Sequence, residues 1–318
     1  MICLKILTVA FNFISALIGA GLASGKEVVV FLGNANFFSI VLCGTLIGAF
    51  SYPFLWIGCT SNGQTQSALF KNKEWLGQAI VKTMNFVFLS TMLGGADSLL
   101  LEIAGIRYGS FITAVLTLII FELGEKTIRC INAITLPLIL VLLLVLLSKK
   151  LSPIQGFFTL SSPILYAGMN TSSAGIYASN MCKELKTKHI PIISITIALF
   201  TSLFLLVVRS IIIGTEHQKI PMYSVSVDTN LMVFGAIIIF TSIVTSCLSS
   251  LKLSTTRHSM SPYVICSFAL IVSMFGFENL IRFLYPALGA VGIIVLLIAF
   301  YRLLQSKLKI CKNGGLGL

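Results

Sequence analysis

Charged residues are scarce in this sequence of 318 residues: they make up 10% of it, against about 25% of a typical soluble globular chain. Hydrophobic residues make up 57%, and the mean hydropathy is +1.00. A chain with so few charges cannot cover a water-facing surface, so we predict an all-α integral membrane protein. Strictly alternating segments of the kind that build membrane β-barrels are missing, which excludes that class.

Motifs of several functional classes are also lacking. None of the eight cysteines forms a CxxC pair, so no disulfide framework or thiolate metal site is expected. The three histidines are expected in loops, and no HExxH motif or nucleophile elbow appears, so we expect no enzyme. The formal net charge is +12, but the basic residues form no patch. We therefore predict a lipid bilayer and a small molecule as partners, and no nucleic acid; protein partners are left open by the sequence.

Long apolar runs recur from end to end, and each is long enough to cross a bilayer as a helix. About ten are distinguishable, at residues 4–32, 37–59, 77–101, 108–123, 127–148, 157–181, 189–213, 229–251, 262–278 and 280–304. We expect one transmembrane domain over residues 1–318. It divides into a first repeat of about 1–150, a second of about 151–304, and a short tail, 305–318.

The basic residues between the runs indicate an orientation. Lys and Arg number about fourteen against six in favour of the side that holds both termini, which predicts cytoplasmic termini. The first run also resembles a signal peptide, because Lys5 precedes it and small residues follow. A mature membrane helix is favoured, because the run is longer than a signal peptide needs and apolar sequence resumes at residues 28–32.

The first run is unusual for its length and its glycines. About 29 residues would form a helix of about 43 Å, whereas the hydrocarbon core is about 30 Å thick. Weak helix formers cluster in it, at Gly19, Gly21, Ser24 and Gly25, which predicts a tilted or interrupted helix. Two alternatives compete: a close-packing Gly21-x-x-x-Gly25 face, and a dinucleotide fingerprint, which lacks the strand and βαβ context it needs.

The sixth run also has helix-breaking and polar residues inside a long apolar stretch. Residues 161–178, SSPILYAGMNTSSAGIYA, hold a proline, glycines and polar side chains in mid-span, and Gly168 lies 149 residues after Gly19, as Pro286 does after Pro137. Interrupted helices at matching positions of two inverted halves are typical of a transporter binding site. We therefore predict substrate-binding residues in the two breaks: Gly19, Ala20, Gly21, Ser24, Gly25, Tyr166, Gly168, Asn170 and Thr171.

These stretches resemble a known family. GAGLASGKE at residues 19–27 and GFENLIRFLYPALGAVG at 276–292 are similar to sequences of the YkvI-like bacterial membrane proteins, of the amino acid–polyamine–organocation superfamily. Weaker matches lie at residues 90–97, 131–140, 166–170 and 240–242. The resemblance implies the five-plus-five inverted-repeat, leucine-transporter-like fold, with broken first and sixth helices, in the bacterial cytoplasmic membrane. Lys26 and Asp97 depart from the residues usual in the family.

Five residues are candidates for ion coupling: Glu27, Lys26, Asp97, Thr241 and Ser242. The resemblance implies a possible Na⁺ site at Thr241 and Ser242, whereas the alternative is that these hydroxyls bond carbonyls of their own helix. Lys26 and Glu27 could pair, Lys26 could extend to the outer surface, or both could be interfacial charges. Asp97 is either a functional intramembrane acid or a solvated helix end.

The expected function is secondary active transport of a small organic solute, such as an amino acid, coupled to Na⁺ or H⁺. The alternative is a small-molecule-sensing receptor subunit on the same fold, resembling the germination permeases. No cofactor is expected beyond Na⁺ as a possible coupling ion.

Overall fold

The computed structural model describes residues 2–18, 20–255 and 261–314, and these fold almost entirely into helices. Five of the helices are long and apolar enough to cross a membrane: α4 (Phe37–Thr60), α6 (Glu74–Ala104), α10 (Ile190–Ile212), α12 (Met232–Ser254) and α15 (Tyr285–Gly314). Shorter apolar helices stand among them: α1 (Ile2–Leu17), α7 (Gly109–Glu122) and α13 (Pro262–Ser273). Helix α8 (Glu125–Lys149) is longer, but its apolar part covers only Ile134–Lys149. Large apolar side chains on the outer faces, such as Leu199 and Leu203, are exposed, as lipid-facing positions require.

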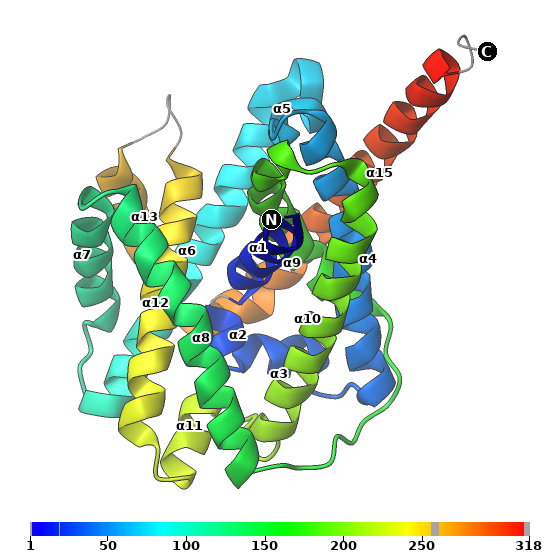
Figure 1. The fold of residues 1–318 in the computed structure, drawn as a ribbon. Helices are drawn as coiled ribbons and strands as arrows, with labels where there is room; N and C mark the ends of the chain where they lie inside the picture. Colours follow the sequence, from blue (N-terminus) through cyan, green and yellow to red (C-terminus); the bar gives the residue numbers. More distant parts are fainter. Residues whose placement is uncertain (1, 19, 256–260, 315–318) are drawn as a thin grey trace.

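The remaining helices connect or complete these. They are α2 (Ala20–Ala23), α3 (Lys26–Leu32), α5 (Thr65–Phe70), α9 (Ser161–Ser179), α11 (Pro221–Asp228) and α14 (Phe277–Asn279), with a π-helical segment at Leu280–Leu284 before α15. Figure 1 shows α11 at one end of the bundle and the C-terminal part of α15 projecting from the other.

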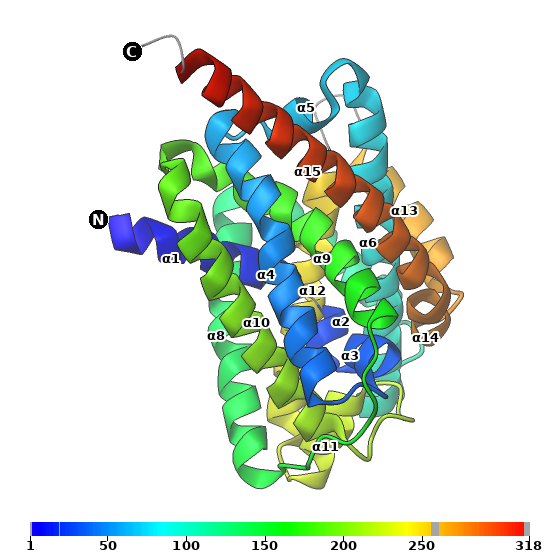
Figure 2. The ribbon, with the colours of Figure 1, turned by 90° about the vertical axis from the view of Figure 1, so that its right-hand side faces the viewer.

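Helices from the two halves of the chain pack against each other in matching order. α1 packs on α9, α4 on α10, α6 on α12 and α7 on α13. Figure 2 shows α4 and α10 side by side along the bundle. Close contacts support these pairs, because a Cβ atom at Gly48 in α4 would come within 2.6 Å of the Ser194 carbonyl oxygen in α10. Four helices of the first half thus pack on four helices of the second, taken in the same order along the chain.

The first helix is interrupted, as its glycines predict. Helix α1 ends at Leu17, α2 covers one turn, and α3 begins at Lys26. At the second interruption Gly25 has a φ of +80°, a left-handed conformation that glycine adopts at little cost. In Figure 2 the first helix lies across α4 and α10 rather than along them, so it is steeply tilted as well as broken.

The predicted break in the sixth run is wrong, because α9 is continuous from Ser161 to Ser179. Pro163 lies in its first turn, where a missing N–H costs no hydrogen bond. The Asn170 amide donates to the Tyr166 carbonyl and the Ser172 hydroxyl to the Gly168 carbonyl, so these polar groups bond their own helix. Gly168 serves packing, because a Cβ atom there would lie 2.8 Å from Ile293 Cγ1 in α15.

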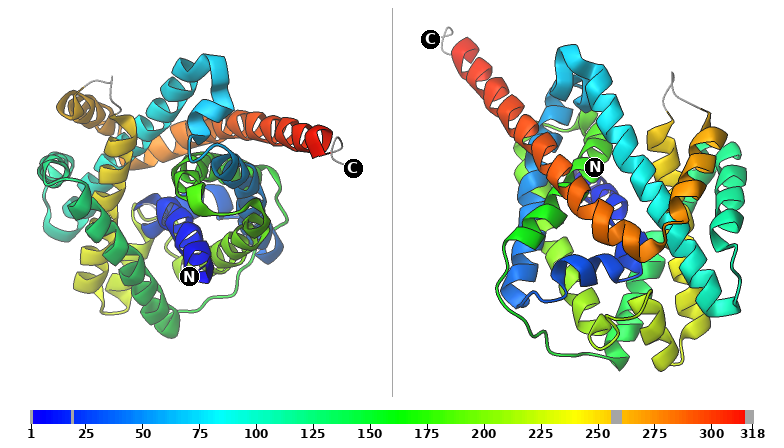
Figure 3. Two further views of the ribbon diagram at one scale, coloured as in Figure 1. Left: turned by 45° about the horizontal axis from the view of Figure 1, so that its top comes forward. Right: turned by 180° about the vertical axis from the view of Figure 1, so that it is seen from behind.

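An extended segment, residues 150–160, replaces the expected start of the sixth run. The Ser152 N–H donates to the Ser210 carbonyl in α10, and the Phe157 N–H to the Asn34 carbonyl beyond α3. The right-hand view in Figure 3 shows this segment passing along the outside of the bundle from the end of α8 to α9. It joins the two halves of the chain and anchors the turn that follows α3.

We expect Gly25→Ala to destabilise the protein. Alanine in a left-handed conformation costs about 1–2 kcal/mol, and its Cβ would lie 3.1 Å from Ile212 Cγ2. Gly105→Ala is the matched control, because Gly105 has a φ of +67° but no neighbouring atom within 4 Å. Thermal unfolding of the purified protein in detergent should show a larger loss for Gly25→Ala. An equal loss in both variants would show that the Ile212 contact adds nothing.

Candidate functional site

The interrupted first helix buries an acidic side chain. Glu27 is the second residue of α3, and 4% of it is exposed. Its carboxyl group lies over Gly21 in α2, so closely that a Cβ atom at Gly21 would overlap Oε1. Gly21 therefore makes room for the carboxyl group, and the break positions it inside the protein. Glu27 is therefore not an exposed surface charge.

Two buried tyrosines from other helices lie beside Glu27. Tyr166 comes from α9 and Tyr285 from the start of α15, and both are fully buried. Their hydroxyl groups approach the Glu27 carboxyl group. Among the described residues, neither hydroxyl forms a hydrogen bond of good geometry. Burying a hydroxyl without a partner is costly, so these two groups are available to the carboxyl group.

Aromatic rings enclose this cluster. The Tyr166 ring lies 5.3 Å from the Phe31 ring of α3, and the Tyr285 ring lies 5.5 Å from the Phe88 ring of α6, measured between centroids. Four separate helices therefore contribute side chains around one carboxyl group.

The polar groups of the break are largely satisfied within the protein. The Ser24 hydroxyl donates to the Gly21 carbonyl at 2.9 Å and accepts from the Lys26 N–H at 3.3 Å. The Leu22 carbonyl accepts from the Gly25 N–H, and the Ser24 carbonyl accepts from the Met222 N–H of α11. The predicted residues Ser24 and Gly25 thus stabilise the break. Gly19 lies outside the described residues, and Ala20 is the first residue of α2.

Lys26 does not pair with Glu27. Its Nζ donates to the Gln218 carbonyl at 3.0 Å and lies 3.2 Å from Glu278 Oε1. The two neighbouring charges therefore point in different directions, Glu27 into the protein and Lys26 toward the loops at the α11 end. Of the alternatives for Lys26, pairing with Glu27 is wrong.

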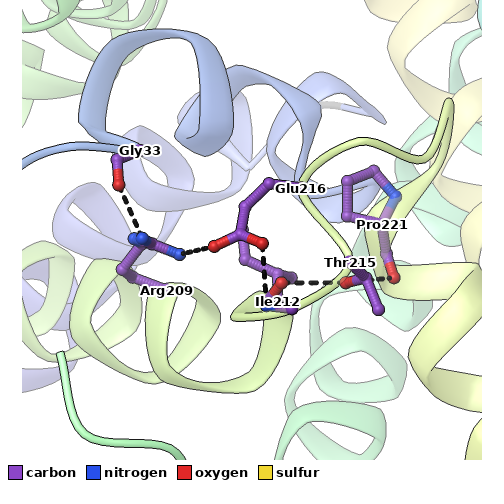
Figure 4. A network of polar contacts seen from close by, with 7 residues as sticks. Gly33, Arg209, Ile212, Thr215, Glu216 and Pro221 are labelled. Carbon is purple, nitrogen blue, oxygen red and sulfur yellow. Dashed lines mark hydrogen bonds and ion pairs between the residues drawn. The ribbon is translucent and has the colours of Figure 1, made fainter. Parts of the chain in front are cut away.

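A second buried cation holds the other end of α3. Arg209 of α10, 5% exposed, donates to the Gly33 carbonyl and lies 2.9 Å from Glu216 Oε1. Figure 4 shows this network, which continues through Thr215 to the carbonyls of Ile212 and Pro221. The loop between α10 and α11 therefore contacts α3 near both ends, through Lys26 and through Arg209.

The other residues of α9 predicted to bind substrate, Gly168, Asn170 and Thr171, lie in a continuous helix and not in a break. Gly168 packs against α15. The Asn170 amide bonds the Tyr166 carbonyl at 3.1 Å. The Thr171 hydroxyl is buried, with no hydrogen-bond partner among the described residues. Of the α9 candidates, only Tyr166 reaches the acidic side chain.

Asp97 and Glu27 lie in different places. The Asp97 Oδ1 accepts a hydrogen bond from the Ser110 N–H at 3.3 Å, in the first turn of α7. A carboxylate that binds N–H groups at a helix start is a capping interaction. Asp97 therefore joins α6 to α7, and this contact gives it a structural role.

The two hydroxyl groups predicted to bind Na⁺, those of Thr241 and Ser242, differ in their hydrogen bonding. The Thr241 hydroxyl donates to the Ile237 carbonyl of its own helix at 2.7 Å, which is the alternative that sequence left open. Ser242 is fully buried, and its hydroxyl has no partner in the part of the chain that the structure describes. Helix α12 packs against α2, so the break and α12 are neighbours.

Sequence reasoning missed Tyr285 and the partners Glu278, Arg209 and Glu216. Tyr285 and Glu278 both lie in the stretch 276–292, where the family resemblance is specific. That resemblance was the signal that could have identified Tyr285 and Glu278.

Comparison with known proteins supports the resemblance. No family model matches the chain. It is 24% identical over 320 residues to YkvI, a Bacillus subtilis protein described as an uncharacterized membrane protein, covering 89% of this chain and 92% of the relative. It is 25% identical over 328 residues to the uncharacterized protein YyaD of the same organism, covering 93% and 96%. The chain is thus similar to YkvI-like membrane proteins along nearly its whole length.

Glu216 provides a pH-dependent test of the Arg209 network. Partial burial alone would raise the pKa of Glu216, but hydrogen bonds from backbone N–H groups and from Arg209 lower it below its ordinary value. The stabilisation is therefore complete above the ordinary pKa of about 4.3 and is lost as the pH falls through the lowered pKa of the folded protein.

We expect Glu216→Gln to lower the unfolding temperature at pH 7 by an amount equivalent to about 1 kcal/mol, because 33% of the Glu216 side chain is exposed and screened. The difference from the wild type should shrink at pH 4 and below. Asp228→Asn, an exposed acid in α11, is the control and should change little at either pH. A deficit for Glu216→Gln that does not depend on pH would contradict an ionic role.

Proposed function

We propose that the protein is a secondary active transporter that moves a small organic solute, coupled to a monovalent cation, H⁺ or Na⁺. The observation that carries this proposal is the Glu27 carboxyl group, buried where the first helix is broken. An acidic side chain inside a membrane is costly, and such residues typically mark ion or substrate pathways.

The broken helix itself supports transport. Irregular backbone at membrane depth is tolerated only where protein or a watery cavity surrounds it. In transporters, discontinuous helices supply backbone groups to the substrate site near the bilayer midplane. Gly21, Ser24 and Gly25 of the break, with Tyr166 of α9, form the substrate site in this proposal.

The pairing of helices supports a ten-span, five-plus-five inverted repeat, the leucine-transporter-like fold of the amino acid–polyamine–organocation superfamily. The spans are the first helix (α1 to α3), α4, α6, α7 and α8, followed by α9, α10, α12, α13 and α15. Four of the five expected counterpart pairs pack together. In this arrangement α9 contributes its side chains to the site without being broken.

The proposed setting is a bacterial cytoplasmic membrane, with both termini in the cytoplasm and the α10–α11 loop outside. Lys26 and Arg209 then hold α3 from the outer side. A substrate arriving from outside would reach the break only after some of these contacts open.

The topology can be tested with reporter fusions. A reporter after Leu318 should be cytoplasmic, and one inserted in the 215–228 loop should be external, because basic residues favour the cytoplasmic side. The same location at both sites would refute the topology.

Transport can be tested by substituting Gly21. We expect Gly21→Leu to abolish saturable uptake into proteoliposomes, with a small-solute panel as substrates, because the side chain would displace Glu27. Gly105→Leu is the control at an open surface position. Insertion and monodispersity must be the same as in the wild type. Uptake at the wild-type level by Gly21→Leu would refute the site, and saturable binding without uptake by the wild type would favour the receptor alternative.

A further inference from the structure

We propose that Glu27 carries the coupling ion as a proton, and that the Tyr166 and Tyr285 hydroxyls stabilise the carboxyl group in both of its protonation states. This inference rests on the proposed transport function and selects H⁺ over Na⁺. It follows from which groups surround Glu27 and from which oxygens at the break are already bonded.

Among the described residues, no cation lies beside the Glu27 carboxyl group. Tyr166 of α9 and Tyr285 of α15 are its titratable neighbours, and behind them lie Cys43 of α4 and Cys247 of α12. The buried cations Lys26 of α3 and Arg209 of α10 are bonded elsewhere, Lys26 to Glu278 and Gln218, and Arg209 to Glu216 and Gly33. A buried carboxylate without a cation is strongly disfavoured, whereas the neutral acid is not.

The two hydroxyl groups suit a carboxyl group that gains and loses a proton. When Glu27 is ionised, both tyrosine O–H groups can donate to its oxygens, and charge-assisted hydrogen bonds of this kind are strong. When Glu27 is protonated, its own O–H can donate to a tyrosine oxygen. One proton is added or removed at the carboxyl group, and both tyrosines stay neutral throughout.

Na⁺ is a poorer fit to the same place. A hard cation collects several oxygen ligands at once. The carbonyls of Gly21, Leu22 and Ser24 already accept hydrogen bonds from Ser24, Gly25 and Met222. The Thr241 hydroxyl is bonded to its own helix. A proton needs neither a vacant coordination shell nor extra space, which the close contact between Glu27 and Gly21 would not provide.

Infrared difference spectroscopy of the purified, substrate-free protein tests the inference with the proton as the probe. The wild type should show a carboxylic-acid carbonyl band at neutral pH that disappears at higher pH, and Glu27→Gln should lose this band. Asp97→Asn should keep it, because Asp97 caps α7 elsewhere. A band unchanged by Glu27→Gln would overturn the proposal.

Two further measurements of the same band test the roles of Na⁺ and of the two tyrosines. Adding Na⁺ at constant pH should leave the band in place, and its loss would overturn the choice of H⁺. Tyr166→Phe and Tyr285→Phe should each raise the pH at which the band disappears, by about one unit, since each removes a donor to the ionised form. Tyr108→Phe, at an exposed position, should leave that pH unchanged. An unchanged midpoint in both buried variants would refute the role of the hydroxyls.

The spectroscopic result does not depend on transport. If the band behaves as expected but no solute is taken up, the transport proposal fails while the proton site stands. If uptake occurs and is driven by a Na⁺ gradient alone, the transport proposal stands and the proton inference fails.

Discussion

Inside a membrane no water is present to satisfy a broken backbone or an ionised side chain, and the rest of this structure depends on how the first helix meets that constraint. The hydroxyl of Ser24 bridges the two sides of the break, and α11 supplies the N–H of Met222 to its carbonyl. The break is therefore stable only because elements distant in sequence pack around it.

The same constraint gives the two neighbouring charged residues of α3 different roles: Lys26 holds the structure together, and Glu27 is the candidate for chemistry. Lys26 bonds the Glu278 carboxylate and the Gln218 carbonyl. Because Glu278 is exposed, this ion pair costs little desolvation energy. Glu27 turns the other way, and among the described residues its carboxyl group lies beside the Tyr166 and Tyr285 hydroxyls and over Gly21. A helix that carries both thus connects the loops at one end of the bundle to a buried acid.

Local composition was a good guide to some features and a poor one to others. The glycines and excess length of the first run predicted its interruption, because left-handed backbone at Gly25 and the close approach at Gly21 both require glycine. Similar residue types in the sixth run led to a wrong prediction of a break, because Gly168 is used for helix packing and Asn170 and Ser172 bond their own helix. Composition does not distinguish glycine that breaks a helix from glycine that packs one.

The sequence by itself determined the membrane class, the approximate extent of the apolar helices and the break in the first of them, because hydropathy and backbone propensity are local properties. Tertiary structure alone decided which acid is buried and what surrounds it. Tyr166 and Tyr285 are more than a hundred residues apart and reach Glu27 only because α9 and α15 pack together beside the first helix. Adjacent residues on a helix face different directions, but only packing decided that Glu27 meets the two tyrosines and that Lys26 meets Glu278 and Gln218.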